Sequence, residues 1–350
     1  MPDMGNQSKM TDTSGHPKGA LRGVVAVGAS AGGVEALTAF ASRLPSDLPY
    51  AVLVALHMPA SAPSVLAGIL DRSGPLPAVS ASHGAKMEAK KIYVAVPDRH
   101  LLMEDHRLVL SEGPTENGYR PAINALFRSV ALTLGHSAIG VVLSGVLDDG
   151  VAGAAAIRAR GGTTIAQLPE DALFSAMPQN ALGAGVIDHK AAATEIGPLL
   201  AQLAGRKLEE RVMEPDARME LENLIAMGGR FSTEFDGEAL GPHSGYICPD
   251  CNGSLMIVTE DNGFRCRVGH AWTGEALLKA RDDEVEQALW IALRSLQEKA
   301  RLSRKMADTI SPGSLHRRYT QAADEAERAM SVLGQRLSRT TSEADEHGGH

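Results

Sequence analysis

Cysteine, basic charge and long apolar runs are all scarce in this sequence of 350 residues. Its three thiols, Cys248, Cys251 and Cys266, form an odd and clustered set, which excludes the disulfide framework of a small secreted domain. The 34 lysines and arginines are outnumbered by 42 aspartates and glutamates, and the net charge of −8 provides no basic face for phosphates. We therefore expect no nucleic-acid partner.

No apolar run reaches the roughly 18 residues of a membrane-spanning helix, so we expect no insertion into a membrane. Residues 1–22 are polar and lack the apolar core of a signal peptide. This predicts a disordered leader and a cytoplasmic location. The remaining composition, 44% hydrophobic and 22% charged, is typical of a globular protein of about two domains.

Short apolar runs alternate with helical stretches between residues 23 and 204, which we interpret as one catalytic domain. The pattern predicts an α/β fold with a doubly wound, mostly parallel sheet covered on both faces. A polar turn at 104–107 adds a β-hairpin. The expected strands are 24–27, 50–56, 92–96, 138–143 and 163–167, and the expected helices are 33–42, 121–134, 150–160 and 191–203.

The remainder of the chain divides into four expected segments. Residues 205–245 are a charged linker with some helix, and 246–280 are a small zinc-ribbon-like segment. Residues 281–340 carry apolar residues at helical spacing and predict a helical hairpin, followed by a disordered tail at 341–350. Packing within the hairpin explains its apolar stripe, and self-association through a coiled coil is the alternative.

A loop of small residues follows the first expected strand and has three interpretations. Gly28, Ser30 and Gly32 fit the pattern G-x-S-x-G, in which a tight strand-to-helix turn exposes a serine hydroxyl. With Gly33, the loop also fits a degenerate dinucleotide-binding motif, and a turn without chemistry is the third interpretation. The dinucleotide motif needs an acidic residue after the second strand, where this sequence has His57.

His57 and a pair of aspartates also follow expected strands. His57 ends the run 50–56, and Asp148 and Asp149 follow the run 138–143. Functional groups gather beyond the carboxyl ends of parallel strands, so these side chains and Ser30 are expected to meet. One carboxylate would orient the imidazole, which would accept the serine proton, while the other aspartate caps the next helix. The order Ser, His, Asp disfavours the α/β-hydrolase family, whose order is Ser, Asp, His.

Four ordered motifs make residues 23–204 resemble the catalytic domain of the bacterial chemotaxis methylesterase family, the protein-glutamate methylesterases. The resemblance implies a serine hydrolase without a cofactor, which removes methyl esters from glutamates of methylated chemoreceptor helices; some members also deamidate receptor glutamines. It implies that Ser30 is the nucleophile, His57 the general base and Asp149 the orienting carboxylate. The motifs are Gly28–Gly33, Leu56–Pro59, Arg120–Pro121 within 113–130, and Leu143–Gly150.

The sequence departs from this family at several points. Asp148 stands where the family commonly has asparagine, so we assign it the capping role; Ala31 replaces a frequent threonine and Val146 a frequent methionine. Backbone N–H groups of Ala31 and of residues 145–149 are expected to hold the oxyanion. The receiver domain of well-known members needs about 100 residues, more than the 22 before the first strand. We therefore expect control through residues 205–350 or a regulatory protein partner that binds there.

The cysteine segment has the spacing of a metal site. Cys248 and Cys251 precede, and Cys266 and His270 follow, the expected strand 255–259, which predicts a structural zinc ribbon. His243 is a spare ligand, and a redox-active or decayed site is the alternative. For the whole chain, the alternatives to a methylesterase are a catalytically weak scaffold and a nucleotide-binding sensor.

Overall fold

The computed structural model describes residues 21–61, 63–206, 215–228, 241–259 and 263–347. The expected leader at 1–22 lies outside these residues except for its last two positions, as do parts of the expected linker. The chain divides into two compact units, Met1–Ala276 and Leu277–His350. Among the described residues, no helix has both the length and the apolar character that crossing a membrane requires.

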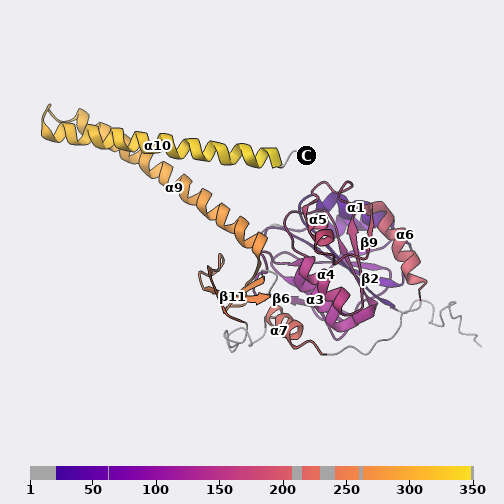
Figure 1. The fold of residues 1–350 in the computed structure, drawn as a ribbon. Helices are drawn as coiled ribbons and strands as arrows, with labels where there is room; N and C mark the ends of the chain where they lie inside the picture. The colour runs from indigo at the N-terminus through magenta and orange to yellow at the C-terminus, as the bar shows by residue number, and fades with distance from the viewer. Residues whose placement is uncertain (1–20, 62, 207–214, 229–240, 260–262, 348–350) are drawn as a thin grey trace, which may run out of the picture. The chain divides into compact units, whose positions relative to one another are not determined.

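A seven-stranded parallel sheet forms the centre of the first unit (Figure 1). Its central strands are built almost entirely from Val, Ala and Leu and are buried along their whole length, as expected of strands covered on both faces. The sheet order is β3-β4-β2-β1-β7-β8-β9. The strands are β1 (Gly23–Ala29), β2 (Tyr50–Leu56), β3 (Ala78–Ser80), β4 (Lys91–Val94), β7 (Ala138–Val142), β8 (Thr163–Gln167) and β9 (His189–Ala191).

Three helices cover each face of this sheet. One apolar cluster joins the sheet to α1 (Gly33–Ser42), α2 (Leu66–Ser73) and α6 (Ala193–Ala204). The other joins it to α3 (Ile123–Leu134), α4 (Val151–Ala159) and α5 (Ala176–Gly183), together with the hairpin of β5 (His100–Glu104) and β6 (Arg107–Ser111). The predicted doubly wound α/β fold with a β-hairpin is confirmed.

Five short elements between residues 23 and 204 were not expected from the sequence: α2, β3, α5, β9 and the 3-10 helix η1 (Gly135–Ser137). The strands β3 and β9 have three residues each and lie at the two edges of the sheet, too short to show an alternating pattern. Helix α5 has only eight residues and contains Pro178, which weakens its helical signal. Elements of this size are specified by the tertiary contacts that they make.

A helix and a small antiparallel sheet complete the first unit. Helix α7 (Ala217–Ala226) lies in the expected linker, and its first turn is capped by the side chain of Asp216. The sheet contains β10 (His243–Ile247), β11 (Ser254–Thr259), β12 (Gly263–Cys266) and β13 (Ala271–Thr273) in sequence order. We call residues 243–273 the ribbon.

Two long helices, α9 (Gly274–Asp308) and α10 (Ser314–His347), make up nearly all of the second unit. Arg304 on α9 pairs with Asp324 and Glu327 on α10, and small buried residues lie nearby on both helices, Ala300 and Ala307 on α9 and Ala323 and Ala326 on α10. Helix α10 continues past the expected end at residue 340, because neither glycine nor proline occurs between residue 340 and Gly348.

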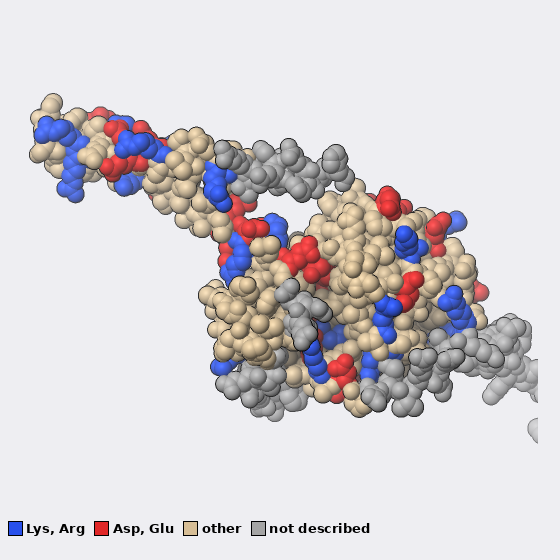
Figure 2. Space-filling model, viewed as in Figure 1, with Lys and Arg blue, Asp and Glu red and all other residues tan. Residues whose placement is uncertain are grey.

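Charges of both signs are interspersed on the molecular face drawn in Figure 2. On this face the described residues form no broad basic surface over the catalytic domain. This arrangement agrees with the acidic net charge of the sequence.

Candidate active site

Three adjacent strands deliver the candidate catalytic residues to one edge of the sheet. Strand β1 lies between β2 and β7; Ser30 follows β1, His57 follows β2 and Asp149 lies in the loop after β7. Backbone hydrogen bonds extend the sheet at this edge, from the N–H of His57 to Ala29 and from the N–H of Ser30 to Ser144. The three side chains are therefore positioned by the most deeply buried part of the fold.

The turn that carries Ser30 relies on glycine at two positions. Gly32 has a φ of 65°, the left-handed conformation that glycine adopts without strain, and helix α1 starts at the next residue. At Gly28 an added Cβ would lie 2.2 Å from the Cγ2 of Ile123. Gly28 therefore makes room for internal packing, which disfavours its use as a phosphate-binding glycine.

A hydrogen-bonded series runs from the hydroxyl to the carboxylate. The Nδ1 atom of His57 lies 3.1 Å from the Oγ of Ser30, and its Nε2 lies 2.7 Å from the Oδ2 of Asp149. When Nε2 carries the proton and donates it to Asp149, Nδ1 is free to accept the hydroxyl proton of Ser30. The His57 and Asp149 side chains are only 4% and 3% exposed, which protects this interaction from water.

Asp149 is fixed by backbone donors from two helices. Its carboxylate accepts N–H groups of Ile123 at 2.7 Å and Asn124 at 3.1 Å, which lie in the first turn of α3, and of Gly150 at 3.0 Å. The amide oxygen of Asn124 in turn accepts the N–H groups of Gly150 and Gly153 at the start of α4. The two helix starts cap each other, and this orients the carboxylate toward His57.

The expected capping role of Asp148 is wrong. Its Oδ1 accepts the hydroxyl of Thr273 in the ribbon at 2.7 Å, and Asn124 caps α4 instead. Burial raises the pKa of Asp148 to about 6, and the nearby carboxylates of Glu275 and Asp149 add to the rise against the Thr273 hydrogen bond. Two adjacent aspartates thus serve different partners.

Two residues of this site were not among the sequence candidates. The ring of Tyr119 stacks on the imidazole of His57 with ring centres 3.7 Å apart and planes 5° apart, and Asn124 caps α4. Both lie within the segment 113–130 that carries one of the four motifs, which is the only signal in the sequence that points to them.

The backbone around Ser30 limits where an oxyanion can bind. The N–H of Gly145 donates to the carbonyl of Phe174 at 2.9 Å, so this group of the expected 145–149 loop is occupied. Ala31 and Gly32 precede the first residue of α1, where N–H groups and the helix dipole favour negative charge. Ala31 therefore remains the leading donor for an oxyanion formed at Ser30.

Comparisons with known proteins agree with this geometry. The family model described as CheB methylesterase matches residues 25–200, just over half of the 350 residues, and the chain belongs to the CheB methylesterase family. This confirms the resemblance inferred from the four motifs. The matched range contains Ser30, His57 and Asp149.

The relatives match about half of this chain. A protein-glutamate methylesterase/protein-glutamine glutaminase of Anaeromyxobacter dehalogenans is 39% identical over 180 residues, 51% of this chain and 53% of the relative. One of Geobacter metallireducens is 34% identical over 180 residues, 50% of this chain and 48% of the relative. The solved CheB methylesterase catalytic domain of Thermotoga maritima is 29% identical, with a TM-score of 0.50, and covers 52% of this chain and 98% of that chain. The chain thus spans about half the length of the curated relatives it matches.

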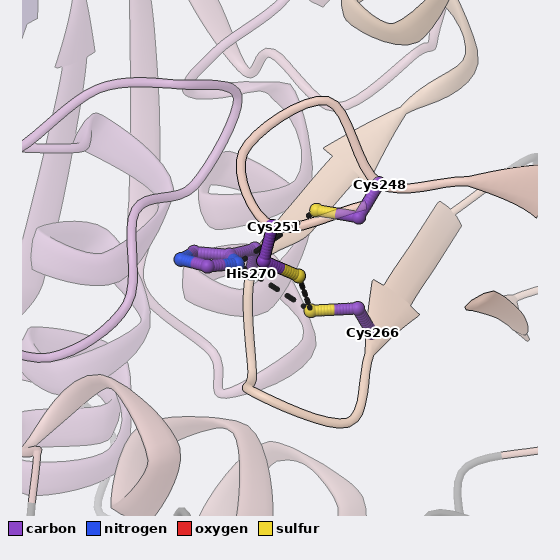
Figure 3. Close-up of side chains that lie close together, drawn as sticks. All are labelled: Cys248, Cys251, Cys266 and His270. Carbon is purple, nitrogen blue, oxygen red and sulfur yellow. Dashed lines mark hydrogen bonds between the residues drawn. The ribbon is translucent and has the colours of Figure 1, made fainter. Parts of the chain in front are cut away.

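The four expected metal ligands lie together in the ribbon (Figure 3). The ligand atoms of Cys248, Cys251, Cys266 and His270 are all within 4.8 Å of one another. The Nδ1 of His270 is 3.4 Å from the Cys266 sulfur and 3.7 Å from the Cys248 sulfur, and the Cys251 and Cys266 sulfurs are 3.6 Å apart.

This arrangement fits a tetrahedral ion. Ligands bound to one zinc at about 2.1–2.3 Å are separated by about 3.5–3.8 Å, and the described contacts lie in or near that range. His243, the spare candidate, is an exposed residue outside the described cluster. The structure thus contains a Cys3His cluster suited to a metal ion.

Proposed function

We propose that this chain is a protein-glutamate methylesterase, a serine hydrolase that removes methyl esters from glutamate side chains of chemoreceptor helices in chemotaxis or a related chemosensory pathway. The observation that carries the proposal is the hydrogen-bonded series from Ser30 through His57 to Asp149. The names of the family and of its relatives support the choice of ester.

In the proposed first step, the Oγ of Ser30 attacks the ester carbonyl carbon while Nδ1 of His57 takes the hydroxyl proton. Asp149 stabilises the resulting imidazolium through Nε2. The backbone N–H of Ala31 holds the tetrahedral oxyanion at the start of α1. Collapse of this intermediate breaks the bond to the methoxy oxygen, which takes the proton from Nδ1 and leaves as methanol.

The second half of the cycle uses the same groups with water. His57 removes a proton from water, the hydroxide attacks the acyl carbon, and the proton returns to Ser30 as its ester bond breaks. The products are a glutamate carboxylate and the free enzyme. A receptor glutamine would follow the same route with ammonia as leaving group, and the relatives' names include protein-glutamine glutaminase.

The surface beside Ser30 supports a helical protein substrate. Leu173, Phe174 and Val146 are apolar residues exposed by 67%, 38% and 36%, and the first two lie against Gly32 in the serine turn. Exposed apolar residues grouped around a reactive group are typical of a protein-binding surface. We propose that they contact the apolar face of a receptor helix while a methylated glutamate enters the site.

We further propose that Cys248, Cys251, Cys266 and His270 hold a structural zinc ion. With four protein ligands the site would be closed, so the ion would stabilise the ribbon and take no part in hydrolysis. The three cysteines form no disulfide, as is usual in a reducing compartment, which supports a cytoplasmic location. The C-terminal region is the proposed binding site for a regulatory protein.

Methanol release from methylated receptor membranes tests the activity with the full chain. Ser30→Ala and His57→Ala should each lower the rate on the order of 10⁴-fold, and the double variant should be little worse than either, because the two groups act as a unit. Ser42→Ala, an exposed serine of α1, is the matched control and should keep the wild-type rate. Methanol release that survives Ser30→Ala would refute the proposal.

A further inference from the structure

The ribbon contacts the catalytic region at the segments that carry the active site. The carbonyl of Ala271 accepts the N–H of Asn117 at 2.7 Å, and the N–H of Ala271 donates to the carbonyl of Thr115 at 3.1 Å. Strand β13 therefore pairs with residues 115–117 through a single parallel bridge between Glu116 and Ala271. The backbone N–H of Thr273 also donates to the side chain of Asn117 at 2.9 Å.

This first segment leads directly to the general base. Glu116 and Tyr119 close a tight turn through two backbone hydrogen bonds of 3.2 and 3.0 Å, and the Tyr119 ring stacks on His57. Asn117, inside the turn, has a φ of 55°, a conformation that residues with a Cβ adopt rarely. The pairing with β13 thus holds the turn that presents Tyr119 to the imidazole.

The second segment is the loop before the orienting carboxylate. The hydroxyl of Thr273 bonds Asp148, whose neighbour Asp149 bonds His57. Leu147 in this loop has a φ of 61°, which costs energy for a leucine. Its carbonyl accepts the amide of Asn180, and that amide also donates to Glu275 two residues beyond β13.

We propose that strand β13 of the ribbon positions the catalytic residues, with Thr273 as the positioning residue that holds the Asp148–Asp149 loop and Ala271 holding the turn of Tyr119. This inference rests on the proposed esterase function. It assigns to the region outside the family match a part in forming the active site. The ribbon would then control the rate of the reaction from residues that never touch the substrate.

The test compares two substitutions of Thr273 in the full chain. Thr273→Val keeps the shape and removes the hydroxyl, and should lower kcat for p-nitrophenyl acetate by about tenfold, the effect of one lost hydrogen bond to a charged group. The KM should be unchanged, because substrate contacts remain. Thr273→Ser restores a hydroxyl and should recover most of the wild-type kcat. Thr320→Val on α10, which also removes a part-buried hydroxyl, is the matched control.

Two further measurements separate the possible failures. Trp272 is buried in β13, so in a Trp290→Phe background, where it is the one remaining tryptophan, its fluorescence reports whether the ribbon of each variant is folded. A fluorophosphonate probe that fails to label the wild-type chain refutes the esterase function itself. If the wild type is active and a folded Thr273→Val variant has an unchanged kcat, only the positioning role is refuted. The positioning role is also refuted if the kcat of Thr273→Ser is no higher than that of Thr273→Val.

Discussion

The catalytic region at residues 23–204 and the ribbon at residues 243–273 gather reactive side chains over very different sequence distances. In the catalytic region, three adjacent parallel strands bring Ser30 and His57 together with Asp149, which lies more than 100 positions after Ser30. In the ribbon, all four candidate ligands lie between Cys248 and His270. The first arrangement depends on a complete sheet, and the second on two short turns.

The two regions also differ in what stabilises them. The parallel sheet is covered on both faces by large apolar clusters. The buried apolar residues of the ribbon, apart from its cysteines, are Leu255, Met256, Phe264 and Trp272 among those that the structure describes. So small an apolar core rarely sustains a fold alone, and a bound metal commonly supplies the difference. The catalytic region should therefore stay folded under conditions that unfold the ribbon.

Removal of the metal should produce the largest effect and separate the two regions. We expect one zinc per chain in the wild type and none in His270→Ala, with the loss of about 10 kcal/mol of binding free energy and unfolding of the ribbon. Metal analysis gives the content. In a Trp290→Phe background Trp272 is the one remaining tryptophan, so a red shift of its emission reports ribbon unfolding.

His243→Ala is the matched control for this experiment, because His243 is an exposed histidine of the same ribbon outside the cluster. It should keep the metal and the wild-type emission. A ribbon that remains folded without metal, or a catalytic region that unfolds together with it, would contradict the comparison.

The sequence separation of the residues in each site explains how much of that site could be predicted from the sequence. The strand ends that carry Ser30 and His57 follow from apolar runs and the general rule for parallel sheets. The ligands of the ribbon follow from spacing alone. Tyr119 and Asn124 could not be assigned, because their contacts with His57 and with α4 exist only once distant elements are packed.

Two further features could not be predicted from the sequence: the separate roles of adjacent aspartates and the burial of charged residues. Asp148 and Asp149 have the same chemistry and neighbouring positions, so nothing local indicates that Asp149 caps α3 while Asp148 bonds the ribbon. Glu116 and Arg265 are charged residues, yet they are only 3% and 2% exposed. Arg265 lies 149 positions from Glu116 in the chain, so the burial of this pair depends on tertiary contacts that the local sequence does not show.

The next largest effect is expected at this buried ion network, which joins the two regions. Arg128 of α3 pairs with Glu116 at 2.5 Å, and Arg265 of β12 approaches the same carboxylate at 3.4 Å. Glu116→Gln should lower the free energy of unfolding by about 3 kcal/mol, because both arginines stay buried with less compensation. Urea unfolding measures this loss. Glu88→Gln, whose exposed carboxylate pairs with Lys91, is the control and should change stability by less than about 0.5 kcal/mol.

The pH dependence of this loss has a definite sign. Burial alone would raise the pKa of Glu116. The positive charges of Arg128 and Arg265 lower it by more than burial raises it, so the pKa of Glu116 is about 2. A carboxyl group with a lowered pKa in the folded state contributes stability above its unfolded pKa of about 4.3, and this contribution disappears as the pH falls toward 2. The difference between wild type and Glu116→Gln should therefore shrink between pH 5 and pH 3. A difference that is constant over this range would rule out the charge as its cause.

The smallest effect is expected at Asp148, where the ribbon meets the active-site loop. Its pKa of about 6 lies above the unfolded value near 3.9, so the ionised carboxylate destabilises the fold at neutral pH, and the penalty declines as the pH falls from 6 toward about 3.9. Asp148→Asn should therefore raise the free energy of unfolding by about 1–2 kcal/mol at pH 8 and leave it nearly unchanged near pH 3.5. The amide oxygen still accepts the Thr273 hydroxyl, so kcat should stay near the wild-type value. Asp105→Asn, at an exposed turn, should alter neither quantity. If Asp148→Asn changes the free energy of unfolding equally at both pH values, burial of the Asp148 charge has no energetic cost. If Asp148→Asn lowers kcat strongly, the charge of Asp148, rather than its hydrogen bond to the ribbon, supports the catalytic loop.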